Sequence, residues 1–499
     1  MVIVSNRLPI VLKKEEDGSI TSKPGSGGLV TALAPLLRNR SGLWIGWSGS
    51  NNMTEEEVEQ GTQDAKEKIG FALSSLVLTS DEIDCFYNGF SNEILWPLFH
   101  DFASDCNFDP KYWGFYQRVN EKFADKILDN VSEEDFLWIQ DYHLLLVAQE
   151  LRIKGYTKPI SFFLHIPFPS LDIYLKLPWR FQILHALLEY DFIAFQTLRD
   201  KKNFMGCVKH LYPKARLEQK KGILRIIRED RETKVAAFPI SIDYNEFSGQ
   251  AQKQEVSEAA WYFHEKLPNQ KIVFSTDRLD MSKGIPYRLK AIRHLLEKHP
   301  ELHRKVSFIQ SVVPSRTDVP KYQNLKQTID RLVGDINSEF SQEDWVPIKY
   351  YFKTLNRREL LSCYRTAEVA LITPLKDGMN LVAKEYVAAN IEENGVLVLS
   401  EFAGAAAQLF HDALMVNPFD IEGVSEAIYH ALYMPEEERK AHMNRLRRIV
   451  KKYDIFWWIH SFMHSAISRD LKDFPLIEEY IPSFDPSKEL EASSITLFS

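Results

Sequence analysis

The stretch EVALITPLKDGMNLVAKE, residues 368–385, combines a short apolar run, a glycine turn and the beginning of a helical pattern. The run from Glu368 to Ile372 predicts a buried strand. Asp377-Gly378 then predicts a tight turn into a helix that begins near Met379. Because strands that alternate with helices form parallel sheets covered on both faces, this stretch indicates the α/β fold class.

The same alternation recurs in two series, and the second begins after a polar, helix-prone segment at residues 250–268. We therefore expect two Rossmann-like domains, at residues 1–245 and 246–455, with parallel sheets facing a central cleft. Residues 456–499 are expected to form a helix and tail that pack back on the N-terminal domain. The expected strands are Val2–Ser5, Leu43–Gly46, Phe136–Asp141, Ile160–His165, Phe192–Gln196, Val235–Ile240, Lys271–Thr276, Lys305–Ser311, Ile348–Phe352, Glu368–Ile372, Gly395–Ser400 and Ala413–Asn417.

The composition argues against several classes of protein. With 61 Lys and Arg against 69 Asp and Glu, the net charge of −8 disfavours general nucleic-acid binding, which needs basic surfaces. No apolar run reaches the ~18 residues that a membrane span requires, and Met1 leads directly into a strand pattern, so we expect a cytoplasmic protein without a membrane anchor. Four scattered cysteines predict neither a zinc site nor a disulfide framework; they are Cys85, Cys106, Cys207 and Cys363.

Residues with useful chemistry follow the expected strands. Asp141, His165, Arg278 and Asp377 each lie at or just after a strand end. In parallel α/β sheets, ligands bind outside the carboxyl ends of the strands, and paired domains hold them in the cleft between. These residues are therefore expected to face the cleft.

A glycine-rich turn, Pro24–Gly28, precedes an apolar helical pattern at Leu29–Leu37. Backbone N–H groups at such a turn, together with the positive end of a helix, suit a phosphate. A dinucleotide fingerprint would place GxGxxG directly after the first strand, whereas roughly twenty residues intervene here. An NAD-dependent oxidoreductase is therefore a distant alternative, and a plain flexible turn is the other.

Arg278 and Lys283 are five positions apart on a loop that leads toward a helix expected at Tyr287–Leu296. Their cations can converge on a diphosphate, the guanidinium through a planar fork and the ammonium as a point charge. Neutralising a departing nucleoside diphosphate is what sugar transfer from a nucleotide donor requires. The alternative is that both side chains are simply solvated.

The start of the helix after Asp377-Gly378 suits an anion, because the N–H groups of residues 379–382 would point outward. Glu385 lies one to two turns deeper, where a carboxylate can accept hydrogen bonds from two ribose hydroxyls. A surface salt bridge is the alternative for Glu385.

Taken in order, ten segments resemble the trehalose-6-phosphate synthase family over about residues 2–465. The segments are SNR (5–7), GSGG (25–28), LWIGWSG (43–49), YNGFSNEILWP (87–97), WIQDYHL (138–144), FFLHIPFP (162–169), DRLDMSKG (277–284), PSRTDV (314–319), PLKDGMNLVAKEYV (374–387) and VLSEFAGAA (398–406). The resemblance implies a GT-B fold and a glucosyltransferase that moves glucose from a nucleotide-glucose, UDP-glucose by expectation, to glucose 6-phosphate. It also implies retention, with the donor phosphate helping to deprotonate the acceptor, and neither metal nor cofactor.

The resemblance also assigns site residues. His165 corresponds to the family histidine placed against the transferred glucose, and with Arg278, Lys283 and Asp377 it forms the expected catalytic set. The N-terminal domain is expected to bind the acceptor and the C-terminal domain the nucleotide sugar. The expected donor-binding residues are Gly27, Gly28, Gly378, Met379, Asn380, Leu381, Val382 and Glu385. The expected acceptor-binding residues are Arg7, Trp47, Tyr87, Trp96, Asp141 and Arg316.

Two positions depart from the family pattern. Met281 stands where the family usually has Tyr, and Ser241 replaces a common glycine, the residue that best tolerates unusual backbone angles. Neither change removes a charge from the expected donor site.

Farther along, residues 445–465 predict one amphipathic helix with a basic solvated face, which includes Arg447, over an aromatic packing face.

Other functions remain compatible with parts of this pattern. A glucosylglycerol-phosphate synthase would share the HIPFP segment, and a non-catalytic regulatory homologue would sense sugar phosphates without needing a complete donor site. The base of the donor nucleotide and the oligomeric state are left open, a homo-oligomer included. Because the resemblance takes up almost the whole chain, we expect a separate phosphatase to release free trehalose.

Overall fold

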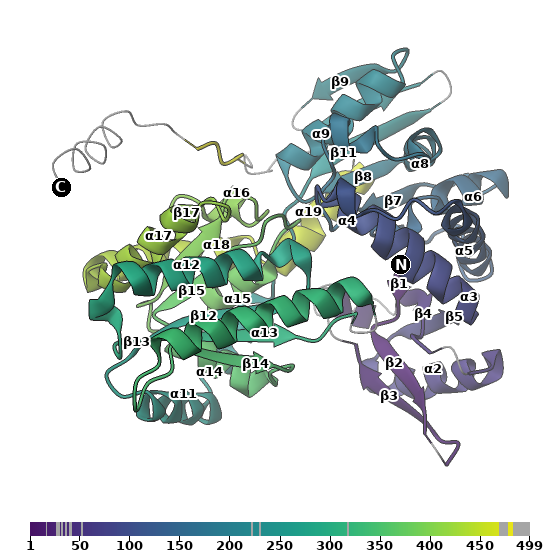
Figure 1. The fold of residues 1–499 in the computed structure, drawn as a ribbon. Helices are drawn as coiled ribbons and strands as arrows, with labels where there is room; N and C mark the ends of the chain where they lie inside the picture. The colour runs from purple at the N-terminus through teal and green to yellow at the C-terminus, as the bar shows by residue number, and fades with distance from the viewer. Residues whose placement is uncertain are drawn as a thin grey trace.

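The computed structural model describes residues 1–15, 17–25, 30, 33–34, 37–38, 42–50, 53–220, 223–228, 231–316, 319–468 and 478–482. These residues form two lobes, each built on a largely parallel sheet (Figure 1). The α/β fold class predicted from the sequence is confirmed. Each of the twelve strands expected from the sequence overlaps an observed strand.

The N-terminal lobe contains a nine-stranded sheet, as far as the described residues define it. The seven strands from β5 to β11 in the spatial order given below run parallel. β10 pairs antiparallel with both β11 and β9. The order is β5 (Ala72–Leu76), β4 (Leu43–Trp47), β1 (Val2–Arg7), β6 (Leu137–Gln140), β7 (Ile160–Phe163), β8 (Phe192–Phe195), β11 (Glu232–Ala237), β10 (Ile223–Ile227) and β9 (Arg216–Lys220). A separate antiparallel hairpin pairs β2 (Ile10–Lys14) with β3 (Ile20–Pro24).

The C-terminal lobe contains a six-stranded sheet in which every recorded pairing is parallel. Most residues of these strands are buried, as expected for a sheet covered on both faces. The order is β14 (Ile348–Phe352), β13 (Val306–Val313), β12 (Lys271–Arg278), β15 (Val369–Ile372), β16 (Val396–Ser400) and β17 (Leu414–Val416).

Helices connect the strands, and several begin at side-chain caps. Thr54 and Glu57 form a reciprocal capping box on α2, as Asn356 and Glu359 do on α14. The helices of the N-terminal lobe are α2 (Glu55–Ile69), α3 (Ser80–Glu82), η1 (Ile83–Leu95), α4 (Trp96–Phe99), η2 (Ala103–Asp105), α5 (Pro110–Leu128), η3 (Tyr142–Leu144), α6 (Val147–Ile153), α7 (Leu171–Tyr174), α8 (Arg180–Leu187) and α9 (Leu198–Leu211). Those that follow are α10 (Tyr244–Ala251), α11 (Gln254–Lys266), η4 (Met281–Lys283), α12 (Ile285–Lys298), η5 (Pro300–Leu302), α13 (Pro320–Phe340), α14 (Arg357–Thr366), α15 (Leu381–Ala389), α16 (Ala406–Leu409), α17 (Ile421–Tyr433), α18 (Glu436–Lys452) and α19 (Ile455–Ser468).

The last helix, α19, returns to the N-terminal lobe and lies beside β7 and β8 (Figure 1). The ring of Phe462 stacks on Trp138 of β6 at a centroid distance of 4.1 Å. The indole of Trp458 donates a hydrogen bond to the Phe238 carbonyl, 3.1 Å away. Aromatic side chains of α19 therefore join the core beneath the N-terminal sheet.

The single helix predicted at residues 445–465 is wrong, because the chain forms two helices there. α18 ends at Lys452, and the Asp454 carboxylate accepts a hydrogen bond from the Trp457 N–H, 3.0 Å away, at the start of α19. Arg447 is also buried rather than solvated. Its guanidinium donates to the carbonyls of Val387, Ala388 and Asn390, which lie at the C-terminal end of α15.

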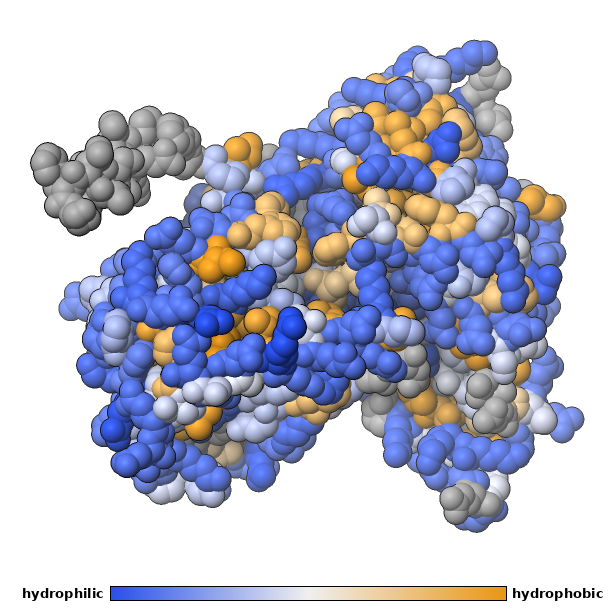
Figure 2. Space-filling model, in the orientation of Figure 1, coloured by the Kyte–Doolittle hydropathy of each residue, from blue (hydrophilic) through white to orange (hydrophobic). Residues whose placement is uncertain are grey.

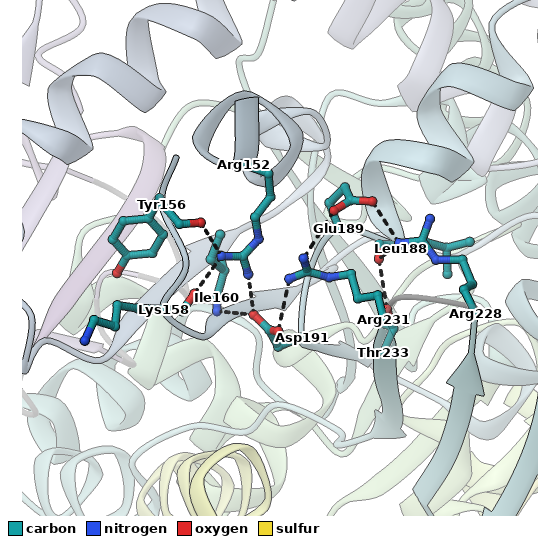
Figure 3. Close-up of polar contacts among 10 residues, drawn as sticks. All are labelled: Arg152, Tyr156, Lys158, Ile160, Leu188, Glu189, Asp191, Arg228, Arg231 and Thr233. Carbon is teal, nitrogen blue, oxygen red and sulfur yellow. Dashed lines mark hydrogen bonds and ion pairs between the residues drawn. The ribbon is translucent and has the colours of Figure 1, made fainter. Parts of the chain in front are cut away.

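A polar network secures the N-terminal lobe at the amino ends of its strands (Figure 3). The Asp191 carboxylate, just before β8, accepts hydrogen bonds from Arg152, Arg231 and the Ile160 N–H, the last at 2.7 Å. Ile160 begins β7, and Arg231 precedes β11. The network therefore ties together neighbouring strands at the edge of the sheet away from the cleft.

Hydrophilic residues cover most of the face shown in Figure 2, and the surface is hollowed between the two lobes. Within the described chain, no helix has both the length and the apolar character that a membrane crossing needs.

Candidate active site

The carboxyl ends of strands from both sheets meet where the lobes touch. The clearest contact joins His165, which follows β7, to Gly378, which follows β15. A Cβ atom at position 378 would lie only 2.1 Å from the His165 carbonyl oxygen. Gly378 is therefore required by the close approach of the two lobes, and not by a positive φ angle, since its φ lies outside that range.

Lys283 and Asp377 form an ion pair beside this contact, with 2.5 Å between Nζ and Oδ2. The same carboxylate oxygen accepts a hydrogen bond from the Asn380 side chain at 3.1 Å. Burial raises the pKa of Asp377, but Lys283 and the Asn380 side chain are among the groups that together outweigh burial and lower it below its usual value. The carboxylate thus stays ionised and fixes the lysine at the carboxyl end of β12 and β15.

The helix α15 begins at this point and points its N-terminus into the same region. Asn380, at φ 73°, caps the helix by accepting from the Ala383 N–H at 3.2 Å. The N–H groups of Leu381 and Val382 lie in the first turn, where an α-helix offers no internal carbonyl partner. Met379 is buried in the turn, and its N–H points to Asp377 Oδ1, 3.4 Å away.

Glu385 lies in the second turn of α15, and its carboxylate accepts a hydrogen bond from the Tyr364 hydroxyl at 2.9 Å. Burial raises the pKa of this carboxyl group, although the Tyr364 hydrogen bond opposes the shift. The tyrosine leaves further acceptor positions of the carboxylate open, because an ionised carboxylate has about four.

Arg278 ends β12 and is exposed. Its guanidinium carbon lies 5.9 Å from the ring centroid of Trp96, which belongs to the opposite lobe. The structure therefore brings Arg278, Lys283, Asp377 and the N-terminus of α15 to one edge of the C-terminal sheet, as the sequence predicts. Gly27 and Gly28 lie outside the described residues.

His165 is held between two glutamine side chains. Its Nε2 lies 2.9 Å from the Gln140 side-chain oxygen, and its Nδ1 lies 3.4 Å from the Gln196 side-chain nitrogen. This arrangement matches a neutral imidazole that carries its proton on Nε2. Burial lowers the pKa of His165 to about 3, so the ring is uncharged at neutral pH.

Three of the expected acceptor residues form one aromatic and cationic cluster in the N-terminal lobe. The Arg7 guanidinium lies 4.3 Å from the Trp47 ring and 5.1 Å from the Tyr87 ring. Burial raises the pKa of Tyr87, but Arg7 and Arg316 more than offset this effect, so the pKa is lowered. The cluster combines a positive charge with flat apolar ring surfaces.

Arg316 follows β13 with φ at 50° and approaches the same region from the other lobe. Its guanidinium lies 4.9 Å from the Trp96 ring and donates a hydrogen bond to the Tyr322 hydroxyl. Burial lowers the pKa of this guanidinium, but Tyr142, Tyr322 and Asp280 together raise it above the usual value. Arg316 therefore stays cationic.

Asp141 follows β6 with φ at 74° and accepts a hydrogen bond from the His165 N–H at 3.1 Å. Burial raises its pKa to about 6, against opposing backbone hydrogen bonds and Arg278. At neutral pH the carboxylate is mostly ionised and can accept hydrogen bonds from sugar hydroxyls.

Sequence reasoning missed several residues of the site. His143 stacks on Tyr87 with ring centroids 5.9 Å apart, and Asp280 contacts both Trp96 and Arg316. Gln140 and Gln196 orient His165. Gln140 and His143 belong to the segment WIQDYHL, and Asp280 belongs to DRLDMSKG. Their position at or just after a strand end could have identified them as site residues. Among the described residues, no group of three His, Cys, Asp or Glu side chains is arranged to hold a metal ion.

Two facing α/β lobes, with cations and a helix N-terminus at the strand ends of one and an arginine-aromatic cluster at those of the other, define a glycosyltransferase with the GT-B fold. The chain belongs to glycosyltransferase family 20, whose family model matches residues 1–468.

Known proteins are similar to this chain over nearly its whole length. The chain is 40% identical over 467 residues to an α,α-trehalose-phosphate synthase (UDP-forming) of Candida albicans, covering 93% of this chain and 96% of that protein. It is 35% identical to an α,α-trehalose-phosphate synthase (UDP-forming) from Burkholderia xenovorans, solved in complex with glucose-6-phosphate, with a TM-score of 0.83 and coverage of 93% and 99%. It is 36% identical to an E. coli structure bound with UDP-2-fluoro glucose, with a TM-score of 0.82 and coverage of 93% and 98%.

Proposed function

We propose that this enzyme transfers glucose from UDP-glucose to glucose 6-phosphate with retention, giving α,α-trehalose 6-phosphate and UDP. One observation carries the proposal. The ring of Trp96 lies within 4.9 Å of Arg316 and 5.9 Å of Arg278, so a single indole links the cations on the two sides of the site. A phosphorylated acceptor and a diphosphate donor can therefore be bound side by side.

The donor occupies the C-terminal lobe in this proposal. Arg278 and Lys283 contact the diphosphate, and Asp377 holds Lys283 in position. The open N–H groups of α15 face the donor, with Gly378 to Val382 lining it and Glu385 accepting hydrogen bonds from the ribose. Gly27 and Gly28 are assigned to the donor site by the family resemblance alone.

The acceptor occupies the pocket that Arg7, Trp47, Tyr87, Trp96 and Arg316 line. The two guanidinium groups bind the 6-phosphate, the aromatic rings enclose the sugar, and the Asp141 carboxylate accepts from its hydroxyls. The neutral His165, whose two ring nitrogens are held by Gln140 and Gln196, lies between the two subsites and packs beside the transferred glucose.

In the transfer step, the anomeric hydroxyl oxygen of the acceptor forms a bond to the anomeric carbon of the donor glucose. The bond from that carbon to the diphosphate oxygen breaks, and the acceptor proton passes to the departing phosphate. Both events occur on one face of the sugar, so the configuration is retained. Arg278 and Lys283 lower the barrier because they stabilise the negative charge that develops on UDP.

The proposal also assigns a role to each domain, a cellular location and the enzyme that uses the product. Residues 1–245 form the acceptor domain, 246–455 the nucleotide-sugar domain, and the helix that follows is associated with the first; the predicted tail lies largely outside the described residues. The enzyme acts in the cytoplasm on small-molecule substrates, and a separate phosphatase removes the phosphate from its product.

The test is a product assay with the purified protein. UDP-glucose, GDP-glucose and ADP-glucose are each supplied with glucose 6-phosphate or glycerol 3-phosphate, and products are identified by NMR. Trehalose 6-phosphate with an α,α linkage, formed fastest from UDP-glucose, supports the proposal. Turnover only with glycerol 3-phosphate would show that glycerol 3-phosphate, and not glucose 6-phosphate, is the acceptor. Absence of turnover with every pair would favour a sugar-phosphate sensor.

A further inference from the structure

Asp280 lies where the two lobes and the two proposed subsites meet. It is 3% exposed, in the loop between β12 and η4. One carboxylate oxygen accepts from the Ser282 N–H at 2.9 Å and faces the Trp96 indole nitrogen at 3.4 Å. The other accepts from the Tyr322 hydroxyl at 3.3 Å and lies 3.6 Å from the Arg316 guanidinium.

These contacts connect parts of the chain that are far apart in sequence. Trp96 begins α4 in the N-terminal lobe, whereas Tyr322 belongs to α13 in the C-terminal lobe. Asp280 also caps η4, the short helix that contains Lys283. A single carboxylate thus supports the turn with the proposed donor cation and, at the same time, the proposed acceptor cation.

The contacts to Arg316 form a relay. The guanidinium donates to the Tyr322 hydroxyl, and that hydroxyl donates to Asp280. Arg316 has a left-handed backbone angle and follows the end of β13, so its backbone alone does not determine where the long side chain points. The tyrosine and the carboxylate hold the guanidinium over the Trp96 ring.

We propose that Asp280 is a positioning residue that orients Arg316 toward the acceptor phosphate and thereby sets the preference for a phosphorylated acceptor. The inference rests on the proposed function. Asp280 touches neither substrate in this assignment and acts through Arg316 and Trp96. Its charge is maintained in the buried site, because Arg316, Lys283 and the Ser282 N–H oppose the effect of burial and its pKa is lowered.

The variant Asp280→Asn keeps the shape of the side chain but removes the charge. We expect its KM for glucose 6-phosphate to rise about 10-fold, the size of one charge-assisted hydrogen bond. The ratio of kcat/KM for glucose 6-phosphate over unphosphorylated glucose should fall by a similar factor. Asp105→Asn is the matched control, since Asp105 also pairs across the lobes, with Lys321 at 2.7 Å, but has no contact to Arg316 among the described residues.

A double-mutant cycle separates positioning from general support of the fold. If Asp280 acts through Arg316, Asp280→Asn should raise the acceptor KM in the wild-type background and add less than about 2-fold in the Arg316→Ala background. If the increases in acceptor KM from the two single substitutions simply multiply in the double variant, the proposal is overturned. So would an acceptor KM within 2-fold of wild type in Asp280→Asn.

A second variant protects the test against misfolding. Tyr322→Phe keeps the ring and removes only the hydroxyl between Arg316 and Asp280, and it should raise the acceptor KM in the same direction by about 3- to 10-fold. An unchanged KM in Tyr322→Phe would count against the relay. Failure of wild-type protein to use glucose 6-phosphate would instead refute the proposed function, so the two failures are distinguishable.

Discussion

The ammonium group of Lys283 lies 2.5 Å from the Asp377 carboxylate, and the two residues follow neighbouring strands, β12 and β15, of the C-terminal sheet. The pair lies beside the first turn of α15. A diphosphate bound there would meet a lysine already held in place.

Replacing Lys283 with Ala should lower kcat/KM on the order of 10²-fold or more, because the variant loses charge stabilisation of the departing diphosphate. Arg278→Ala should have a similar effect. Steady-state kinetics with UDP-glucose and glucose 6-phosphate measure both losses, and Lys290→Ala, on the exposed side of α12, serves as the control. Near-normal turnover in Lys283→Ala and Arg278→Ala would remove both residues from the donor site.

Chelation should leave the activity largely unchanged. The carboxylate at the expected diphosphate position, Asp377, is already paired with Lys283, and two side-chain cations can stabilise the leaving group in place of a metal ion. The measurement is the initial rate before and after dialysis against EDTA. Loss of activity that magnesium or manganese restores would contradict this expectation.

The alternating strand pattern was enough to predict both sheets, because buried parallel strands are continuous apolar runs. It did not predict β5, which is interrupted by Ser74 and Ser75, or the β10–β9 extension, whose strands carry charged residues such as Arg216, Glu218 and Arg225. Apolar runs do not reveal strands that polar residues interrupt. Several motifs end at or just after a strand, which is where the predicted site residues Asp141, His165, Arg278 and Asp377 lie.

The contacts of the site were harder to predict, because they depend on packing between distant segments. Tyr87 is presented by η1, a π-helix with hydrogen bonds that local sequence does not specify. Gly89 allows that helix to pack against Tyr112, because a Cβ atom at position 89 would lie only 2.6 Å from the tyrosine ring. The link from Asp280 to Trp96 spans 184 residues.

Ser241, in place of the family glycine, has no positive φ angle and needs no glycine.

The protein should lose stability as the pH falls below about 6.5. Burial lowers the pKa of His100 to about 4 and the pKa values of His143 and His165 to about 3. Between these values and 6.5, the unfolded chain binds protons that the folded chain does not, so acidification favours unfolding. Each such histidine lowers the free energy of unfolding by up to ~1.4 kcal/mol per pH unit.

Urea unfolding at pH 7 and pH 5 tests this expectation with His143→Phe. Neither ring nitrogen of His143 has a hydrogen-bond partner in the described part of the chain, so the substitution removes no such bond while keeping an aromatic ring against Tyr87. The variant should lose less stability than wild type on acidification. Exposed His210→Phe is the control for introducing a phenylalanine. An identical pH dependence in His143→Phe and wild type would contradict the assignment of a neutral buried ring.

The acceptor site gives the sharpest contrast between the two lobes. Arg7 lies against Trp47 and Tyr87 in the N-terminal lobe, and Arg316 reaches Trp96 from the C-terminal lobe. If both guanidinium groups bind the phosphate of glucose 6-phosphate, replacing either with Ala leaves the dianion with too few partners in a partly buried site. A charge-assisted hydrogen bond contributes roughly 1.5 to 3 kcal/mol, so the acceptor KM should rise about 10- to 100-fold.

The donor should be affected far less, because its proposed contacts belong to Arg278, Lys283 and the start of α15. The KM for UDP-glucose and any slow hydrolysis of the donor without acceptor should therefore stay near wild-type values in Arg7→Ala and Arg316→Ala. KM values for both substrates, measured in both variants, give the answer. Equal losses for donor and acceptor would mean that the variants are misfolded or that the site is wrongly assigned. Unchanged kinetics with glucose 6-phosphate would show that its phosphate binds elsewhere, because no other change in these variants could compensate for the loss of a guanidinium at the binding site.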